Sequence, residues 1–390
     1  MEADGRRGAE SRRLRALSRD ACVAAAVAGG RLAGDLVAVH ARALTIRRAD
    51  GELWSVVAAE AGDAPATLVV ELPQGSAFAA LGLRVGDRAW QPGRRPGEPD
   101  WREGEAQPAS EPTPVSHQDG SSGGDPDRRT EGASRSGAEA GPRRPLAADT
   151  AMLVLGSAVL VDLSGALLWQ AAPRPTSPRP GAWRRLAGAM ARCQPRGGLA
   201  ALAPHVAALA AGGPPPAGLD ALCARAWPPL AALAVAWRNL DAPAVAAAAG
   251  GLAGLGPGLT PAGDDLLVGL LAAYRWGRAR PLAVAEAALL DACGRACEGR
   301  TTALSLARLR YAVRGLLDAR CEAVLVSLWQ EKPPPWSTER HAALGGAADG
   351  LALGAAVDRA WTIGHSSGAD TLTGMVLGLI LAEGAPLGPG

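Results

Sequence analysis

Apolar and polar residues alternate in short runs along residues 21–172, and turn residues such as glycine and aspartate separate the runs. Short runs of this kind, bounded by turn signals, predict β-strands. The expected strands cover 36–46, 53–59, 66–72, 83–90 and 150–163. We therefore expect a small β-rich domain at residues 21–172.

Two segments lack this alternation. Residues 1–20 mix arginines with acidic residues, and residues 91–147 consist mostly of proline, glycine, serine, glutamate and arginine. Such segments bury too little apolar surface to offset the entropy lost on ordering. We expect a disordered tail at 1–20 and a disordered insertion at 91–147 that interrupts the β-rich domain.

The period of the pattern changes after residue 173, where long alanine- and leucine-rich stretches are separated by glycine and proline. Stretches of this length with such boundaries predict helices. They cover 181–193, 198–211, 217–237, 241–253, 261–279, 282–298, 301–331, 338–352 and 367–384. The predicted fold class is α+β, with the β-rich domain followed by a larger all-α domain at 173–390.

Composition narrows the function classes. A net charge of +2 over 390 residues argues against a nucleic-acid partner. The longest apolar runs are too short to span a bilayer, and no secretory signal is visible, so we expect no membrane partner and a cytoplasmic location. The six cysteines form no CxxC pair, which favours buried thiols over a zinc site.

The densest motif is "GLGPGLTPAGDDLLVGLL" at 254–271. Thr260 is a good N-cap and Pro261 suits the first helical position, so a glycine-rich turn leads into a helix. A helix start offers free backbone N–H groups to a phosphate or carboxylate. The alternative is that Asp264 and Asp265 only stabilise the first turn, by about 0.3–1 kcal/mol each.

A second segment repeats this motif, because "TPAGDDLLVG" (260–269) aligns with "HSSGADTLTG" (365–374). The matched pairs are Gly263 with Gly368, Asp265 with Asp370, Leu267 with Leu372 and Gly269 with Gly374. The repeat predicts two related helix starts that lie side by side, with both aspartates at a shared cavity. In the alternative interpretation the glycines serve helix packing alone.

A third polar patch lies in "GRTTALSLARLR" (299–310), where Thr301, Ser305 and Arg308 share one helical face. Two hydroxyls and a guanidinium could complete an anion pocket, although an ordinary surface helix would have the same pattern. His365 stands just before the second helix start. No histidine has a partner serine or cysteine motif, so the sequence gives no support to a hydrolase triad.

These motifs resemble the AllH family, which includes a subunit of oxamate carbamoyltransferase from anaerobic allantoin degradation. The resemblance rests on the glycine–aspartate motif, on "TTALS" (301–305), on "GHSSGADTLTGMVLGL" (364–379) and on the strands around "GDAP" (62–65). Ala262 stands where the family typically has serine, which removes one possible hydroxyl donor.

The resemblance implies transfer of a carbamoyl group between carbamoyl phosphate and oxamate, by a complex with other subunit types. In this interpretation the catalytic candidates are Asp264, Asp265 and Asp370. The candidate substrate-binding residues are Gly256, Gly258, Thr260, Gly263, Thr301, Thr302, Ser305, Arg308, His365, Ser366, Ser367 and Gly368. The aspartates are expected to be ionised, because the helix dipole favours that form, and to orient the NH₂ group of a small anion.

Two other hypotheses stay open from the residues alone. One is a non-catalytic subunit that holds a small acid or serves assembly. The other is a stand-alone hydrolase that uses Mg²⁺, since paired aspartates beside a glycine loop can hold a hard cation. No further cofactor is indicated, and the sequence does not choose a metal.

Overall fold

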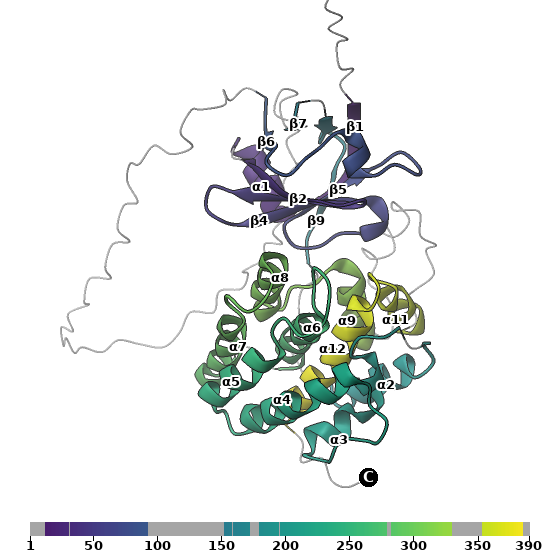
Figure 1. The fold of residues 1–390 in the computed structure, drawn as a ribbon, viewed down its shortest axis with the longest axis vertical. Helices are drawn as coiled ribbons and strands as arrows, with labels where there is room; N and C mark the ends of the chain where they lie inside the picture. Colours follow the sequence, from purple (N-terminus) through teal and green to yellow (C-terminus); the bar gives the residue numbers. More distant parts are fainter. Residues whose placement is uncertain are drawn as a thin grey trace, which may run out of the picture.

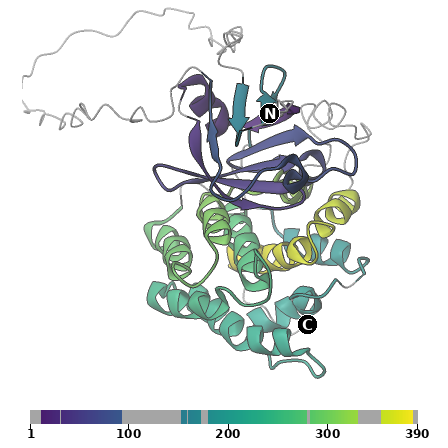
Figure 2. The same cartoon turned by 45° about the horizontal axis from the view of Figure 1, so that its top comes forward.

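The computed structural model describes residues 12–30, 32–92, 152–157, 159–171, 179–194, 196–278, 282–329 and 353–384. A β-rich unit stacks on one end of a larger helical unit, as Figures 1 and 2 show from two directions. The α+β class predicted from the sequence is confirmed.

The β-rich unit is a closed barrel of eight strands. The strands follow the order β5-β4-β3-β2-β6-β7-β8-β1, and β1 closes the barrel by pairing antiparallel with β5. A ninth strand continues along β1 beyond the end of β8. The bounds are β1 Arg12–Asp20, β2 Ala33–Val39, β3 Ala43–Arg48, β4 Leu53–Ala58, β5 Thr67–Glu71, β6 Arg88–Trp90, β7 Met152–Leu155, β8 Val159–Asp162 and β9 Leu167–Trp169.

Three features of the barrel differ from the sequence prediction. Residues 12–20, expected in a disordered tail, form β1, in which Leu14 and Ala16 point into the core between exposed arginines. The inward positions further along are the polar Ser18 and Asp20, which hides the alternation. The single strand expected at 36–46 is a hairpin of β2 and β3, because the chain turns between His40 and Ala43.

The third difference concerns the expected insertion, whose first residue still belongs to the barrel. The side chain of Gln91 accepts a hydrogen bond from the amide of Leu32 and donates one to the carbonyl of Val27. Residues 93–147 lie outside the described residues, as do residues 1–11. The strands β7 to β9 belong to the same sheet as β1 to β6.

The helical unit packs around a pair of central helices, α6 and α12. The barrel has one helix of its own, α1 (Ala21–Ala28), after β1. The other helices are α2 Ala182–Met190, α3 Val206–Ala210, α4 Ala221–Arg238, α5 Ala242–Leu252, α6 Ala262–Gly277, α7 Val284–Ala296, α8 Ala303–Val313, α9 Ala319–Trp329, α11 Leu353–Trp361 and α12 Ser367–Glu383. Short 3₁₀ turns lie at Ala59–Ala61, Phe78–Leu81 and Ala200–His205.

The helix expected over 301–331 is two helices, α8 and α9. Gly315 adopts a left-handed conformation with φ of 80°, and the carboxylate of Asp318 then caps α9 by accepting from two backbone amides. The sequence prediction missed α11, and residues 338–352 lie outside the described residues.

The two units meet where the turn after β4 touches the start of α9. The amide of Ala319 donates to the carbonyl of Asp63 at 2.8 Å, and the Arg320 side chain donates to the carbonyl of Ala61 at 2.9 Å. This junction brings the "GDAP" turn of the barrel close to helix α8.

Candidate functional site

Helices α6 and α12 lie backbone to backbone because glycines remove the side chains between them. A Cβ atom on Gly269 would overlap the carbonyl oxygen of Thr371, and one on Gly374 would overlap that of Leu266. In the sequence repeat Gly269 corresponds to Gly374 and Leu266 to Thr371, so the two contacts are equivalent. One turn further along, a Cβ atom on Gly378 would overlap the carbonyl oxygen of Leu270, so the contacts advance in the same direction along both helices. The helices run parallel and form a pair with approximate two-fold symmetry.

The two helix starts also share a backbone device. Gly263 and Gly368 each press against the end of the preceding helix, where a Cβ atom would overlap the carbonyl oxygen of Leu252 or of Ala360. Their amides donate to the carbonyls of Leu255 and Ile363, at 2.9 and 3.0 Å. The amide of Gly263, predicted to bind an anion, is therefore already used by the loop.

The sequence prediction placed the start of α6 one residue early. Its N-cap is Pro261, and Thr260 makes no capping bond. Instead the Thr260 hydroxyl lies 3.0 Å from the hydroxyl of Ser367, at the start of α12. This contact joins the two helix starts.

Asp264 is buried and has structural partners. One of its carboxylate oxygens accepts from the amide of Gly254 at 2.8 Å, and the other accepts from the hydroxyl of Thr301. The carboxylate therefore ties the glycine-rich loop to the residues before α8. Because both of its oxygens accept hydrogen bonds, Asp264 is the least available of the three predicted aspartates to bind a ligand.

Asp265 is fully buried and pairs with Arg308 of α8, whose Nη1 donates to Oδ1. Its second oxygen, Oδ2, has no well-aligned hydrogen-bond partner among the described residues. Burial raises the pKa of Asp265 above its usual range, against the lowering effects of Arg308 and of the nearby hydroxyls of Ser367 and Thr260. Burial thus outweighs the helix dipole that the sequence argument invoked.

Asp370 occupies the equivalent place in α12, but its partner is different. Its Oδ1 accepts from the amide of Leu199 at 2.6 Å, and Oδ2 has no well-aligned partner among the described residues. Burial raises the pKa of Asp370 to about 7, the Leu199 amide and Ser366 oppose the rise, and the nearby charge of Asp265 adds to it. The expectation of a fully ionised carboxylate is therefore wrong at this position.

The sequence prediction missed the turn that holds Asp370. Gly198 has a left-handed conformation with φ of 62°, and a Cβ atom there would overlap both carboxylate oxygens of Asp370. Only glycine allows this close approach of the backbone. The one available signal was the adjacent pair of glycines at 197 and 198, although the helix predicted over 198–211 already included the second of them.

The other predicted residues form a partly exposed rim. Thr260, Ser366 and Ser367 are half-buried at the paired helix starts, whereas Gly258 and His365 are exposed. The His365 carbonyl accepts from Arg196 at 3.1 Å. Residues 254–257 of the glycine-rich loop, with the half-buried Gly256 among them, line a separate cavity that also includes Arg225 of α4.

The threonines and serine before and within α8 have mainly structural contacts. Thr302 is the N-cap of α8: its hydroxyl oxygen accepts from the amide of Ser305, and the hydroxyl donates to the Leu259 carbonyl at 2.7 Å. Ser305 is buried, and its Oγ has no partner among the described residues. Two residues of the predicted face, Thr301 and Arg308, bond to Asp264 and Asp265 at the start of α6.

The structure brings together Asp264, Asp265, Asp370, Arg308 and the hydroxyls of Thr260 and Ser367. We call this group the paired helix starts. Where the chain is described, no three His, Cys, Asp or Glu side chains gather in a way that could hold a metal ion. The described helices also include none that is long and apolar enough to cross a membrane.

Comparison with known proteins gives two matches. Residues 15–95 match the AllH family N-terminal domain, and residues 252–379 match the family described as oxamate carbamoyltransferase subunit AllH. Together the matches span more than half of the chain, and the second one contains both paired helix starts. No solved structure matches this chain.

Proposed function

We propose, from the premise that this chain belongs to the AllH family, that it binds small anionic substrates for carbamoyl transfer within a multisubunit enzyme. The substrates would be carbamoyl phosphate and oxamate, and the products oxalurate and phosphate, in the breakdown of allantoin. The other subunits of a carbamoyltransferase complex would be its partners.

The observation that supports this proposal is a pair of buried carboxylate oxygens, Oδ2 of Asp265 and Oδ2 of Asp370, that have no well-aligned hydrogen-bond partner among the described residues. Buried polar atoms normally have partners, so two at one place suit a ligand that supplies hydrogen-bond donors. Oxamate and carbamoyl phosphate each carry an NH₂ group beside an anionic end. The NH₂ group would donate to these oxygens, and hydroxyls and Arg308 would bind the anionic end.

The same arrangement supports a role in the chemical step. Transfer forms a bond between the oxamate nitrogen and the carbamoyl carbon, breaks the bond from that carbon to the phosphate oxygen, and releases a proton from the nitrogen. Asp370 has a pKa of about 7, so at neutral pH a large fraction is ionised and able to accept that proton. Asp265, held by Arg308, would orient the nitrogen.

The test compares Asp265→Asn and Asp370→Asn in the complex reconstituted with its partner subunits. An amide carries an NH₂ donor where the carboxylate had only acceptors, so we expect substrate affinity to fall about 5- to 150-fold, equivalent to roughly 1–3 kcal/mol. Asp358→Asn, at an exposed aspartate of α11, is the matched control and should bind normally.

Thermal melting with and without oxamate separates the possible outcomes. Lost turnover with retained binding would assign the chemistry to this subunit, and lost binding alone would make it a binding subunit. If both substitutions lower the melting temperature of the free protein while the ligand-induced shift survives, the aspartates are structural and the proposal is wrong.

A further inference from the structure

Two cavities lie next to each other between the barrel and helix α8. We call the one that includes Arg308 the inner chamber, with a volume of about 170 Å³, and the other the outer chamber, with about 230 Å³. Both are lined by Leu53 of the barrel and by Ala307 and Tyr311 of α8. Because they share these walls, we treat them as two chambers of one interdomain cleft.

The inner chamber reaches the exposed side of Arg308. The Arg308 side chain is 27% exposed, whereas its partner Asp265 is 0% exposed and lies behind it. Only Nη1 of Arg308 is hydrogen-bonded to Asp265, and the nearby carboxylate of Asp318 also acts on the guanidinium through its charge. An arginine has five N–H donors in a planar fork, so this one keeps donors for a carboxylate or phosphate in the chamber.

The inner chamber is lined by one acidic side chain, Asp318, whose charge also acts on Arg308. Its carboxylate accepts from the amides of Arg320 and Cys321 at 3.2 Å each, as the cap of α9. Tyr311 adds a hydroxyl, and burial, with Cys22, Glu52 and Asp20 nearby, raises its pKa to about 12. At neutral pH the Tyr311 hydroxyl is therefore a donor.

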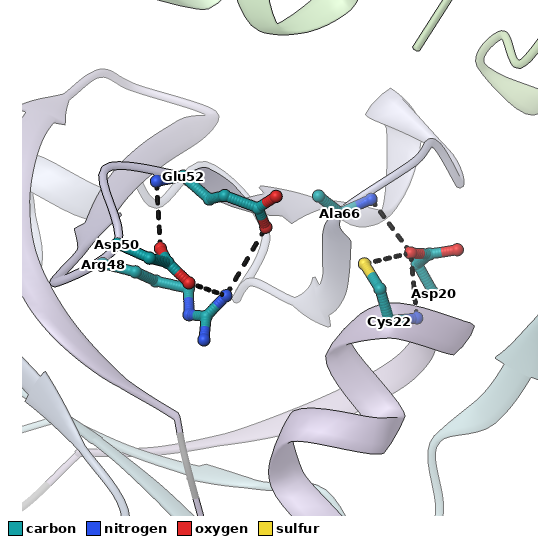
Figure 3. Close-up of polar contacts among 6 residues, drawn as sticks. All are labelled: Asp20, Cys22, Arg48, Asp50, Glu52 and Ala66. Atoms are coloured by element: carbon teal, nitrogen blue, oxygen red, sulfur yellow. Dashed lines mark hydrogen bonds and ion pairs between the residues drawn. The ribbon is translucent and has the colours of Figure 1, made fainter. Parts of the chain in front are cut away.

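The outer chamber is basic. It is lined by Arg47 from the barrel and by Arg310 and Arg314 from α8, against a single acidic residue, Glu52. Figure 3 shows Arg48 placed between Asp50 and Glu52, with Arg48 Nη1 at 2.7 Å from Asp50 and 3.4 Å from Glu52. Arg310 also pairs with Glu298 at 3.3 Å. With three arginines against Glu52, the lining of the outer chamber keeps a net positive charge.

The size of the inner chamber limits the ligand. Sites for drug-sized molecules have volumes of about 300–1,000 Å³, and this chamber has about 170 Å³. It suits an anion of a few non-hydrogen atoms and is too small for a nucleotide. Its barrel wall includes the turn at 62–65, which is fixed to α9 through Asp63 and Ala319.

We propose that a small carboxylate or phosphate enters through the arginine-lined outer chamber and binds in the inner chamber against the free face of Arg308. This inference rests on the proposed function for the class of anion, and it places that anion against the face of Arg308 opposite Asp265 rather than against the carboxylates of Asp265 and Asp370, which do not line the chamber. It also gives the barrel a role, as one wall of the site. Arg308 then links the bound anion to Asp265 at the paired helix starts.

The test measures binding of oxamate, inorganic phosphate and carbamoyl phosphate to the full chain by calorimetry. Ala307→Trp fills the wall shared by both chambers and should weaken binding at least about 10-fold with an unchanged melting temperature. Arg308→Gln combined with Asp265→Asn removes the ion pair as a unit, so no charge is left buried alone, and should weaken binding about 10- to 150-fold.

The outer chamber has its own variant, Arg47→Gln with Arg314→Gln. Loss of two steering charges should slow association about 10-fold at low salt and flatten its dependence on ionic strength. Arg238→Gln, at an exposed arginine at the end of α4, is the control and should change neither the association rate nor its dependence on ionic strength. If Ala307→Trp does not fold, the Arg47→Gln/Arg314→Gln variant decides whether the cleft binds the anion. If none of the three anions binds the isolated chain, the KM values of the same variants in the reconstituted complex replace the calorimetry.

If folded Ala307→Trp and the Arg47→Gln/Arg314→Gln variant both bind the anions normally, the cleft is not the binding site. If Asp370→Asn weakens binding while these cleft variants do not, the anion binds at the paired helix starts and the proposed function stands. A reconstituted complex without any carbamoyl transfer would instead contradict the proposed function, whatever the cleft variants bind.

Discussion

The starts of α6 and α12 have the same backbone arrangement, but their aspartates differ in what compensates their charge. In each, a glycine packs against the preceding helix and an aspartate follows two residues later in the first turn. Asp265 has a guanidinium as its partner, whereas Asp370 has one backbone amide, from Leu199. Both carboxylates are fully buried.

The difference arises outside the repeat. Arg308 belongs to α8, and Leu199 belongs to the turn before the 3₁₀ segment at Ala200–His205. Both residues lie outside the two repeated segments, 260–269 and 365–374. The repeat therefore supplies the close parallel helices, and unrelated segments supply the partners. One half carries a charge-paired aspartate, and the other carries a carboxyl group that titrates near neutral pH.

The largest effect should come from breaking the symmetric backbone contact. Gly269→Ala and Gly374→Ala each place a methyl group into a carbonyl oxygen of the facing helix. Overpacking usually costs about 1–3 kcal/mol, and here both sides are backbone with no side chain to move, so we expect about 4 kcal/mol or more. Chemical denaturation monitored by circular dichroism measures this loss.

The matched control is Gly188→Ala in α2, where an added Cβ meets nothing within 4 Å. That change should stabilise the protein by about 0.5–1 kcal/mol, because alanine is the better helix former. Equal losses at Gly269 and Gly374 are expected from the approximate two-fold symmetry. A mild effect at either one would show that the two contacts are not equivalent.

A smaller effect should distinguish the two aspartates by pH. Asp370 has a pKa of about 7 in the folded protein and about 3.9 in an unfolded chain, so between these values only the folded state keeps the proton. Stability from this group is therefore present at low pH and is lost as the pH rises through 7, by about 2 kcal/mol between pH 5.5 and 8.

Asp370→Asn should remove that loss and flatten the pH dependence of the free energy of unfolding. Asp265→Asn should behave differently, because it leaves Arg308 without its counter-ion and lowers stability at every pH. Denaturant titrations at pH 5.5, 7 and 8 on both variants make the comparison. An unchanged slope in Asp370→Asn would mean that Asp370 stays ionised throughout this range.

The sequence predicted the class of fold because its strongest signals are local. Alternation and helix-length apolar runs found the two units, and glycine–aspartate spacing found both central helices. Strand β1 escaped because charged arginines flank its small inward residues, and closure of the barrel escaped because pairing of β1 with β5 joins segments about fifty residues apart. Periodicity carries no information on such pairing.

The sequence predicted which residues form the candidate site better than it predicted what those residues contact. The aligned repeat indicated that Asp265 and Asp370 are neighbours, and the structure places them so. Their burial was not predictable, because it depends on glycines that draw the backbone of other segments over them, such as Gly198. The barrel wall beside Arg308 also depends on tertiary packing that no local pattern encodes.

The smallest effect concerns the contact that joins the two halves, between the hydroxyls of Thr260 and Ser367. Thr260→Val and Ser367→Ala each remove one hydroxyl, and a net hydrogen bond contributes about 0.5–1.5 kcal/mol. A double-mutant cycle on unfolding free energies should therefore give a coupling of about 1 kcal/mol. Thr362→Val, at an exposed threonine whose hydroxyl donates to the Arg359 carbonyl in its own turn, is the control and should show no coupling to Ser367→Ala.

The same cycle repeated with oxamate present tests whether the ligand affects the contact between Thr260 and Ser367. A coupling that changes on binding places the anion's effect at the paired helix starts. An unchanged coupling confines that effect to the far side of Arg308.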